Sequence, residues 1–419
     1  MNNNYYLRFQ SGDVLGYFIY LIPLLLLTGS FLPDLFLSIS GLIFIYILYT
    51  SNEKKYLFNK FTFLFVIFYF YLIFSSLISE HPDFSLRSTT FYFRYGLFSL
   101  AVWYVIDNNP NFLRNFLIFL AFAFLIAILD GYYQFYNGSH LFTTTPLIAD
   151  RLSLPFNQKL VLGAYISRLF PLLLALLLLV FKPGRKLYLI IGIILIFTDT
   201  LVYLSGERTA LGLMMISTVF ILIFLDEFRT LRLFTLVISI FVIFFISILN
   251  PDIKERNIDY TFEQIGLNDE SNKINLLSPQ HESHFKSAWR MYNDNKVFGI
   301  GPNNFRKLCD KEKYLINHLS CSTHPHNTYI QMLSETGIIG IIFILYFVFY
   351  ISKSSLLSLI SFKNHIYLRL SNYQVCLLAC FVLTLFPFLP TLSFFNNWIN
   401  VIYYLPLGFY LQSIYSKSN

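Results

Sequence analysis

The chain has 419 residues, of which 56% are hydrophobic, 19% aromatic and 13% charged, and its mean hydropathy is +0.59. Because soluble domains carry about 25% charged residues, this composition excludes a soluble globular protein and predicts the lipid bilayer as its surroundings. The net charge of +7 is spread over short segments between apolar runs, so it does not indicate a nucleic-acid-binding surface.

Apolar runs of about 20 residues, the length that crosses a bilayer, recur from end to end. We predict about twelve transmembrane helices, and thus an all-α integral membrane protein. The expected ranges are 14–32, 35–50, 61–79, 91–106, 113–134, 160–180, 187–204, 209–225, 231–249, 328–350, 372–389 and 393–413. The first nine helices lie within residues 1–249 and the last three within 328–419, and residues 250–327 form one large, partly helical loop.

Lysine and arginine are concentrated in alternate connections, which orients the helices by the positive-inside rule. With Met1 in the cytoplasm, the inward connections carry Lys54, Lys55, Lys182, Arg185 and Lys186, among others. Both termini are therefore expected in the cytoplasm, and the 250–327 loop is expected outside.

Several arginines lie on the outer side, where this rule makes them rare: Arg87, Arg94, Arg151 and Arg208. Each either contacts lipid headgroups or a nearby acid, or serves a functional site. Arg208 opens the 209–225 segment, and a helix N-terminus favours anions. Glu207 beside it is either its ion-pair partner or a second acid–base group.

The outer loop carries a helical pattern at His281 to Tyr292 and a turn with Gly299 and Gly301. Cys309 and Cys321 lie in this loop twelve positions apart, so a disulfide between them is plausible if the loop is outside the cytoplasm.

Two histidines stand where this loop meets the next apolar segment. Pro325 disfavours helix for His324, so His326 and Asn327 are expected in the first turn of the following helix, with Asn327 or Thr328 as N-cap. The positive end of the helix dipole disfavours a charged histidine, and neutral imidazole is the form that a general base needs. The simpler alternative for His326 is a hydrogen-bonded side chain at the membrane edge.

The spacing around His326 is that of a known family. His326 and Asn327, then nine positions, Gly337, two positions and Gly340 resemble the signature of the O-antigen ligase family. Other segments resemble it too: Asp130 to Gln134, residues 151–156, Gly206 to Ala210, and the helix followed by the Gly299 turn.

This resemblance implies a glycosyltransferase that moves O-antigen glycan from undecaprenyl pyrophosphate to lipid A-core, without metal or cofactor. The site would lie at the periplasmic face of the bacterial inner membrane. His326 would deprotonate the acceptor and Arg208 would hold the pyrophosphate. Six further residues would bind substrate: Arg151, Arg94 and Arg87 at the phosphates, with Asn327, Glu207 and His324. Asn327 would orient the acceptor or His326.

Direct inversion at the sugar is expected because no pair of nucleophilic carboxylates is evident, although Glu207 and Glu335 leave a covalent route open. Within the superfamily, a repeat-unit polymerase or a protein O-oligosaccharyltransferase would use the same residues. A zinc site formed by His281, His284, His318, His324 and His326 is a competing chemistry. A lipid-linked glycan transporter is the alternative from another class, but its expected internal symmetry is not visible.

Overall fold

A computed structural model describes residues 2–51, 53–148, 151–265, 278–364 and 370–415. Within these ranges the elements are helices, joined by turns and three isolated β-bridges. The helices in the predicted apolar ranges are α1 (Asn2–Leu25), α2 (Phe31–Ser51), α3 (Lys60–Leu77), α5 (Phe93–Asn108), α6 (Phe112–Asn137), α7 (Leu162–Val180), α8 (Arg185–Leu204), α9 (Arg208–Phe224), α10 (Asp226–Leu249), α15 (Thr328–Asn364), α16 (Asn372–Thr384) and α17 (Asn397–Tyr415).

Each predicted apolar range therefore overlaps one of these helices, and the range 14–32 also includes a 3-10 turn (Leu26–Thr28) and the first residues of α2. Among the described residues, seven helices are long and apolar enough to cross a membrane: α2, α3, α6, α7, α8, α10 and α15. Part of α1, together with α9 and α16, forms shorter apolar helices. The described part of the chain is thus built of helices, seven of them able to cross a membrane, and the total of twelve spans stays a prediction.

Local sequence explains where these helices begin. Asn59 caps α3 by accepting a hydrogen bond from Thr62 N at 3.0 Å. Ser371 and Gln374 form a reciprocal capping box at the start of α16. The apolar length of each helix then buries its side chains against neighbours or exposes them to lipid.

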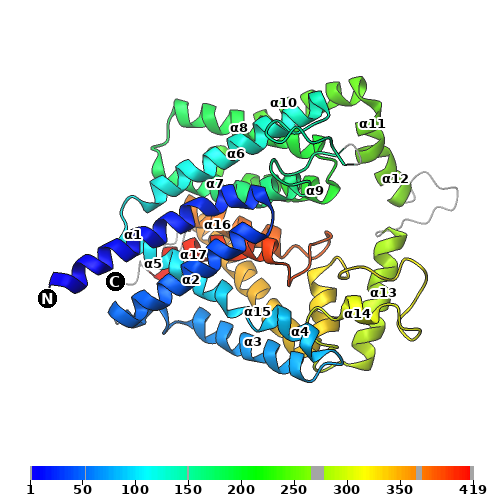
Figure 1. The fold of residues 1–419 in the computed structure, drawn as a ribbon. Coiled ribbons are helices and arrows are strands. Elements are labelled where there is room, and N and C mark those ends of the chain that lie inside the picture. Colours follow the sequence, from blue (N-terminus) through cyan, green and yellow to red (C-terminus); the bar gives the residue numbers. More distant parts are fainter. Residues whose placement is uncertain (1, 52, 149–150, 266–277, 365–369, 416–419) are drawn as a thin grey trace.

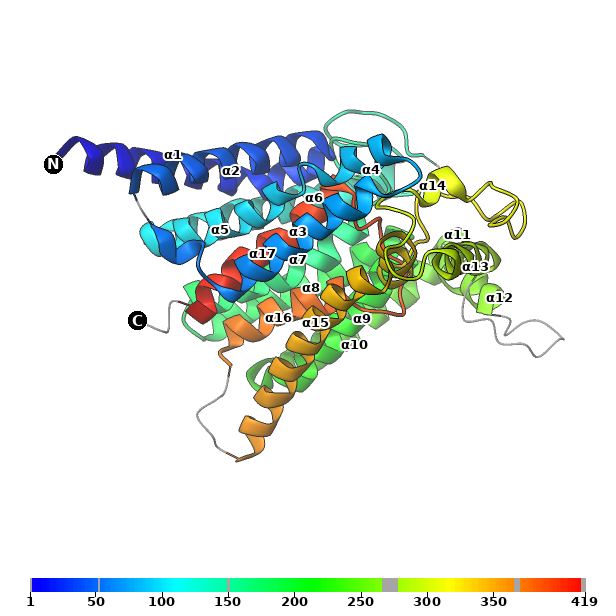
Figure 2. The same ribbon diagram turned by 90° about the horizontal axis from the view of Figure 1, so that it is seen from below.

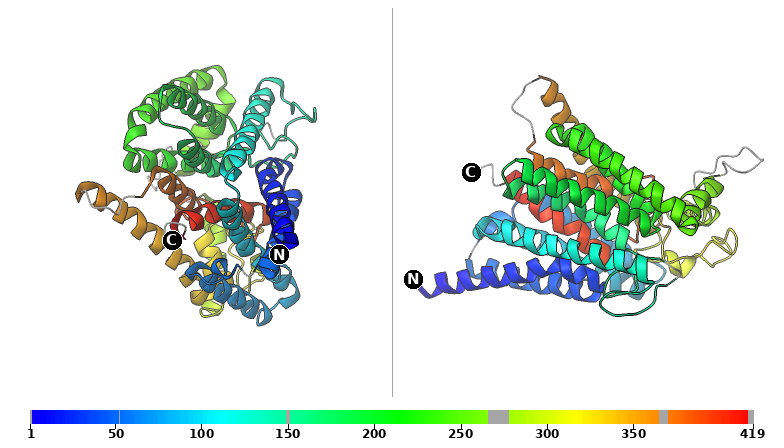
Figure 3. Two further views of the ribbon diagram at one scale, coloured as in Figure 1. Left: turned by 90° about the vertical axis from the view of Figure 1, so that its left-hand side faces the viewer. Right: turned by 90° about the horizontal axis from the view of Figure 1, so that it is seen from above.

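The helices pack around α7, whose side chains from Leu162 to Leu177 are all buried. Figure 1 shows α6, α8 and α10 on one side of α7, and α2, α3 and α5 on the other. The two termini lie at one end of the bundle, and the loop that follows α10 lies at the opposite end (Figure 2). The right-hand view of Figure 3 shows the same separation from above, and the left-hand view looks along the bundle from the side of the termini.

The loop contains α11 (Pro251–Lys254), a π-helical turn (Glu255–Asp259), α12 (Tyr260–Ile265), α13 (Pro279–Asp294) and α14 (Phe305–Leu308). Helix α13 covers the stretch where the sequence predicts a helix. A small apolar core holds this region together, with Met291 of α13 packed near Phe305 and Tyr314. Cys309 is joined to Cys321 with their Cα atoms 5.1 Å apart, which is the pairing that the sequence suggests.

Two glycines join this loop to α15. Gly337 has a φ of 64° and interrupts the helical backbone of α15, and Gly299 has a φ of 71°. A Cβ atom at Gly337 would collide with the backbone of Val297, and one at Gly299 with the backbone of Glu335. The close approach allows Ile300 N to donate to Ser334 O at 3.0 Å. The turn at Gly299 thus packs directly against the backbone of α15 at Gly337.

Candidate functional site

Four imidazole rings meet where α13 faces the start of α15, and we call them the histidine cluster: His281, His284, His324 and His326. The ring centroid of His326 lies 4.1 Å from that of His324, 5.3 Å from that of His284 and 5.4 Å from that of His281. His281 and His284 are one helical turn apart on α13, so both rings face His326.

His326 lies just before α15 rather than in its first turn, which corrects the sequence-based placement. Its φ is 60°, a left-handed conformation that is uncommon for histidine. Its carbonyl accepts a hydrogen bond from Thr391 N at 2.8 Å, and its Nε2 lies 2.9 Å from the hydroxyl of Ser322. These two contacts fix the backbone and the ring of His326, and the ring lies among the other three imidazoles.

The segment between α16 and α17 supplies most of this support. The carbonyl of Thr391 lies 2.9 Å from His324 Nε2, and the carbonyl of Pro387 accepts from the side chain of Asn327 at 2.8 Å. Asn327 Oδ1 also accepts from the backbone of Tyr329 and Ile330, which makes Asn327 the N-cap of α15. Both ends of the Asn327 amide are engaged by backbone, an arrangement suited to positioning His326.

Burial keeps the histidine cluster neutral. It lowers the pKa of His326 to about 3 and that of His324 to about 4, and the neighbouring imidazoles lower both further. Burial also lowers the pKa of His281 and of His284. The carbonyls of Leu319 and Cys321 raise the pKa of His284 somewhat, yet neither ring nitrogen reaches a partner with hydrogen-bond geometry among the described residues. Neutral imidazole is thus the expected form at pH 7.

This predicts a pH-dependent stability. The unfolded chain protonates His324 below about 6.5, whereas the folded chain resists protonation down to about 4. Folding is therefore penalised as pH falls through this window, by roughly 1.4 kcal/mol per pH unit for this one group. We expect the Tm of the purified protein to fall between pH 7 and pH 5, and to fall less in His324→Asn. An equal fall in both proteins would contradict the assignment, and His318→Asn, at an exposed histidine of the same loop, is the control.

Three arginines lie close to one another, and we call them the arginine cluster: Arg151, Arg208 and Arg256. Arg208 is the first residue of α9, and its charge is close enough to lower the pKa of His281. A Cβ atom at Gly206 would lie 2.9 Å from Arg256 Cδ and 3.7 Å from Arg151 Nε, so the glycine allows the close approach of these side chains. Sequence reasoning missed Arg256, because it lies in a run of mixed charges at the start of the loop that has no distinctive pattern.

A buried polar network positions Arg151. Gln134 and Ser153 exchange two hydrogen bonds of 2.9 Å, from the Gln134 amide to Ser153 O and from Ser153 N back to Gln134 Oε1. His140 Nε2 lies 3.0 Å from the Ser153 hydroxyl, and Asp130 accepts from Leu141 N at 2.7 Å. The Asp130 and Gln134 pair thus pins the connection between α6 and α7, two residues from Arg151.

Glu207 caps the central helix. Its carboxylate accepts from Gly163 N at 2.6 Å and from Ala164 N at 3.1 Å, at the N-terminus of α7. Burial raises the pKa of Glu207 to about 7, although the residue keeps some exposed surface, because its carboxylate points toward α7. Substrate binding by Glu207 stays a prediction.

The two remaining arginines have other surroundings. Arg94 forms an ion pair with Asp34 of α2, with Nη2 and Oδ1 2.8 Å apart. Arg87 is exposed on α4 (Pro82–Thr89). Their part in binding phosphate stays a prediction.

A metal centre is not indicated by the geometry. Across the part of the chain that the structure describes, no group of three histidine, cysteine or carboxylate side chains has the spacing of metal ligands. Within the histidine cluster, the rings of His284 and His326 are stacked, whereas the rings of His281 and His324 are tilted relative to that of His326.

Comparison with known families identifies the segment that carries these residues. Residues 191–345 match a family model described as O-antigen ligase. The match runs from α8 into α15 and includes Arg208, Arg256 and the histidine cluster, and Arg87, Arg94 and Arg151 precede it. A comparison with curated proteins gives no match.

Proposed function

Through residues 191–345 the chain belongs to the O-antigen ligase/polymerase superfamily, and we propose that it moves O-antigen glycan from undecaprenyl pyrophosphate to lipid A-core. The reaction would take place at the periplasmic face of the bacterial inner membrane. The observation that carries this proposal is the meeting of Arg208 with the histidine cluster around His326, at the end of the bundle opposite both termini.

His326 is the proposed base. The acceptor hydroxyl loses its proton to His326 while its oxygen bonds to the anomeric carbon of the donor, and the bond from that carbon to the pyrophosphate breaks. The leaving group departs with the bonding electrons as undecaprenyl pyrophosphate, and Arg208 stabilises its growing negative charge. Arg151 and Arg256 lie near Arg208 and add positive charge that stabilises the same leaving group.

Donor binding would adjust the strength of this base. With a pKa of about 3, His326 is a weak base in the empty site, and glycan transfer needs a stronger one. The bound pyrophosphate brings negative charge to the same end of the bundle, and nearby negative charge raises a histidine pKa. His326 would therefore become a stronger base when the donor is in place.

A direct inverting transfer is supported by the state of the nearby carboxylates. Glu207 is engaged by the backbone of α7, and buried Glu335 accepts from Phe305 N at 3.1 Å and from Gln331 at 2.9 Å. Carboxylates that are already satisfied by helix and loop backbone are poor candidates for a covalent glycosyl-enzyme.

The lipopolysaccharide profile of a strain that lacks the gene tests this function. Core-only lipopolysaccharide with full-length glycan left on the lipid carrier would identify a ligase. Core with a single repeat unit would identify a polymerase, and an unglycosylated protein acceptor with a normal profile would identify a protein O-oligosaccharyltransferase. Restoration of every product by His326→Ala would favour a transporter, because transport needs no base.

A further inference from the structure

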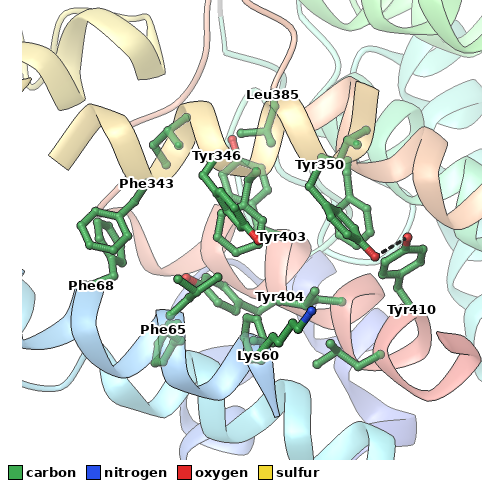
Figure 4. A pocket seen from close by; sticks show the side chains of 18 of the residues that line it. Lys60, Phe65, Phe68, Phe343, Tyr346, Tyr350, Leu385, Tyr403, Tyr404 and Tyr410 are labelled. Carbon is green, nitrogen blue, oxygen red and sulfur yellow. Dashed lines mark hydrogen bonds between the residues drawn. The ribbon is translucent and has the colours of Figure 1, made fainter. Parts of the chain in front are cut away.

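A cavity of about 630 Å³ lies between α3, α15, α16 and α17, within the range of roughly 300–1,000 Å³ that ligand pockets occupy. Figure 4 shows the aromatic side chains that line it, with Phe65 and Phe68 of α3 opposite Phe343 of α15, and with Tyr403 and Tyr404 from α17. Nothing in the proposed transfer uses this space, which lies along the apolar helices.

The cavity opens sideways between α3 and α15. These helices meet where the rings of Phe68 and Phe343 lie 5.1 Å apart, and the second half of α15 then extends away from the bundle (Figure 2). Lining side chains at this opening remain exposed, by 81% for Phe58 and 45% for Tyr346. In a membrane-spanning chain such apolar surface faces hydrocarbon, so a lipid chain has a lateral route inward.

One end of the cavity is suited to a negative charge. Lys60 is the one charged side chain among the described lining residues, and Figure 4 shows its ammonium group directed inward. Lys60 is the first residue of α3, where the helix dipole also favours an anion. The hydroxyls of Tyr350 and Tyr410 lie 3.4 Å apart and line the wall as well. The far end, at Phe68 and Phe394, is apolar.

Lys60 and the histidine cluster lie at opposite ends of the bundle. Helix α3 has 18 residues and is therefore about 27 Å long. Its other end reaches the outer loop, where Ser79 packs against Gly301. An anion at Lys60 thus belongs to the membrane leaflet opposite the histidine cluster.

We propose that the cavity binds one chain of an anionic phospholipid whose phosphate contacts Lys60. An ammonium group binds phosphate as a point charge, and the long aromatic cavity accommodates the chain. A zwitterionic lipid carries its own cation next to the phosphate and gains less from Lys60.

The bound chain has a consequence for the histidine cluster. Leu385 and Phe394 line the cavity, and the segment between them contains Thr391, which hydrogen-bonds to both His324 and His326. Tyr329 and Gln331 of α15 bond to the same segment at Leu385 O and Phe394 N. A filled cavity restrains this segment, and an empty one leaves it less supported.

Native mass spectrometry of the delipidated full-length protein tests the proposal. The probe is an equimolar mixture of phosphatidylglycerol and phosphatidylcholine with identical chains. We expect one phosphatidylglycerol to be retained in clear preference, and Lys60→Gln to bring the two lipids to near-equal retention. Lys54→Gln is the matched control, since Lys54 precedes α3 on the same side and does not line the cavity, and it should keep the preference.

A second variant tests the cavity itself. Leu407→Trp places a larger side chain in the wall and should reduce retention of both lipids. If that variant fails to fold, the charge variants still decide the question. Equal retention of the two lipids by the wild type, or an unchanged preference in Lys60→Gln, would overturn the proposal. Displacement of phosphatidylglycerol by equimolar undecaprenyl phosphate would assign the cavity to an isoprenoid and overturn it as well. Each readout is independent of glycan transfer.

Discussion

Replacing His326 with alanine should reduce glycan transfer by about 10² to 10⁴-fold, the usual contribution of a positioned general base. The loss arises because the acceptor hydroxyl would keep its proton until late in the reaction. The measurement is the initial rate of glycan transfer in proteoliposomes that contain purified protein, lipid-linked glycan and lipid A-core. Donor binding should persist, because Arg208 is untouched.

Two controls separate chemistry from folding. His318→Ala changes an exposed histidine of the same loop and should keep the wild-type rate. His284→Gln removes the buried ring that stacks on His326 and should have an intermediate rate, with the acidic limb of its pH–rate profile shifted. A His326→Ala protein that folds, binds donor and transfers at the wild-type rate would remove His326 as the base.

Replacing Arg208 with alanine should cost about 10² to 10³-fold in the rate of transfer, as expected when one donor to a developing anion is removed. Binding of undecaprenyl pyrophosphate should weaken at the same time, because the exposed guanidinium at the start of α9 contributes in both the bound state and the transition state. Product inhibition by undecaprenyl pyrophosphate measures the binding, and the proteoliposome assay measures the rate.

Arg208→Lys separates charge from shape. Lysine keeps the positive charge but lacks the planar fork that binds two phosphate oxygens, so only partial recovery is expected. Arg185→Ala is the matched control. Arg185 begins α8, and Arg208 follows the opposite end of α8, so this change should leave the transfer rate and the inhibition by undecaprenyl pyrophosphate unchanged. Wild-type inhibition of Arg208→Ala by undecaprenyl pyrophosphate would place the phosphate elsewhere, with Arg151 and Arg256 as the next candidates.

The sequence predicted the helices well because a bilayer imposes a length on each apolar run. All of the predicted apolar ranges overlap helices, from α1 to α17, and the pattern at His281 to Tyr292 lies within α13. Helix ends were less accurate. The helix in the range 372–389 ends at Thr384 in the structure, and the segment after it is an irregular connection that hydrogen-bonds to His324 and His326.

His326 illustrates the limit of local reasoning. Its spacing to Asn327, Gly337 and Gly340 singled it out, and the helix dipole was the expected cause of its neutral state. In the structure it lies before α15 at a positive φ, and the main cause of its low pKa is burial among three other imidazoles. The dipole is a property of sequence neighbours, whereas burial depends on residues that are distant along the chain.

The sequence by itself therefore predicted a helical membrane fold and the approximate positions of its helices, carried the family signature after His326, and suggested the pairing of Cys309 with Cys321. Only the tertiary structure decided which polar side chains meet. It brought α13 to the start of α15, placed Arg256 beside Arg208, and used Thr391 to hold both His324 and His326. Apolar length and local spacing are encoded along the chain, but contacts between helices arise only when the whole bundle packs.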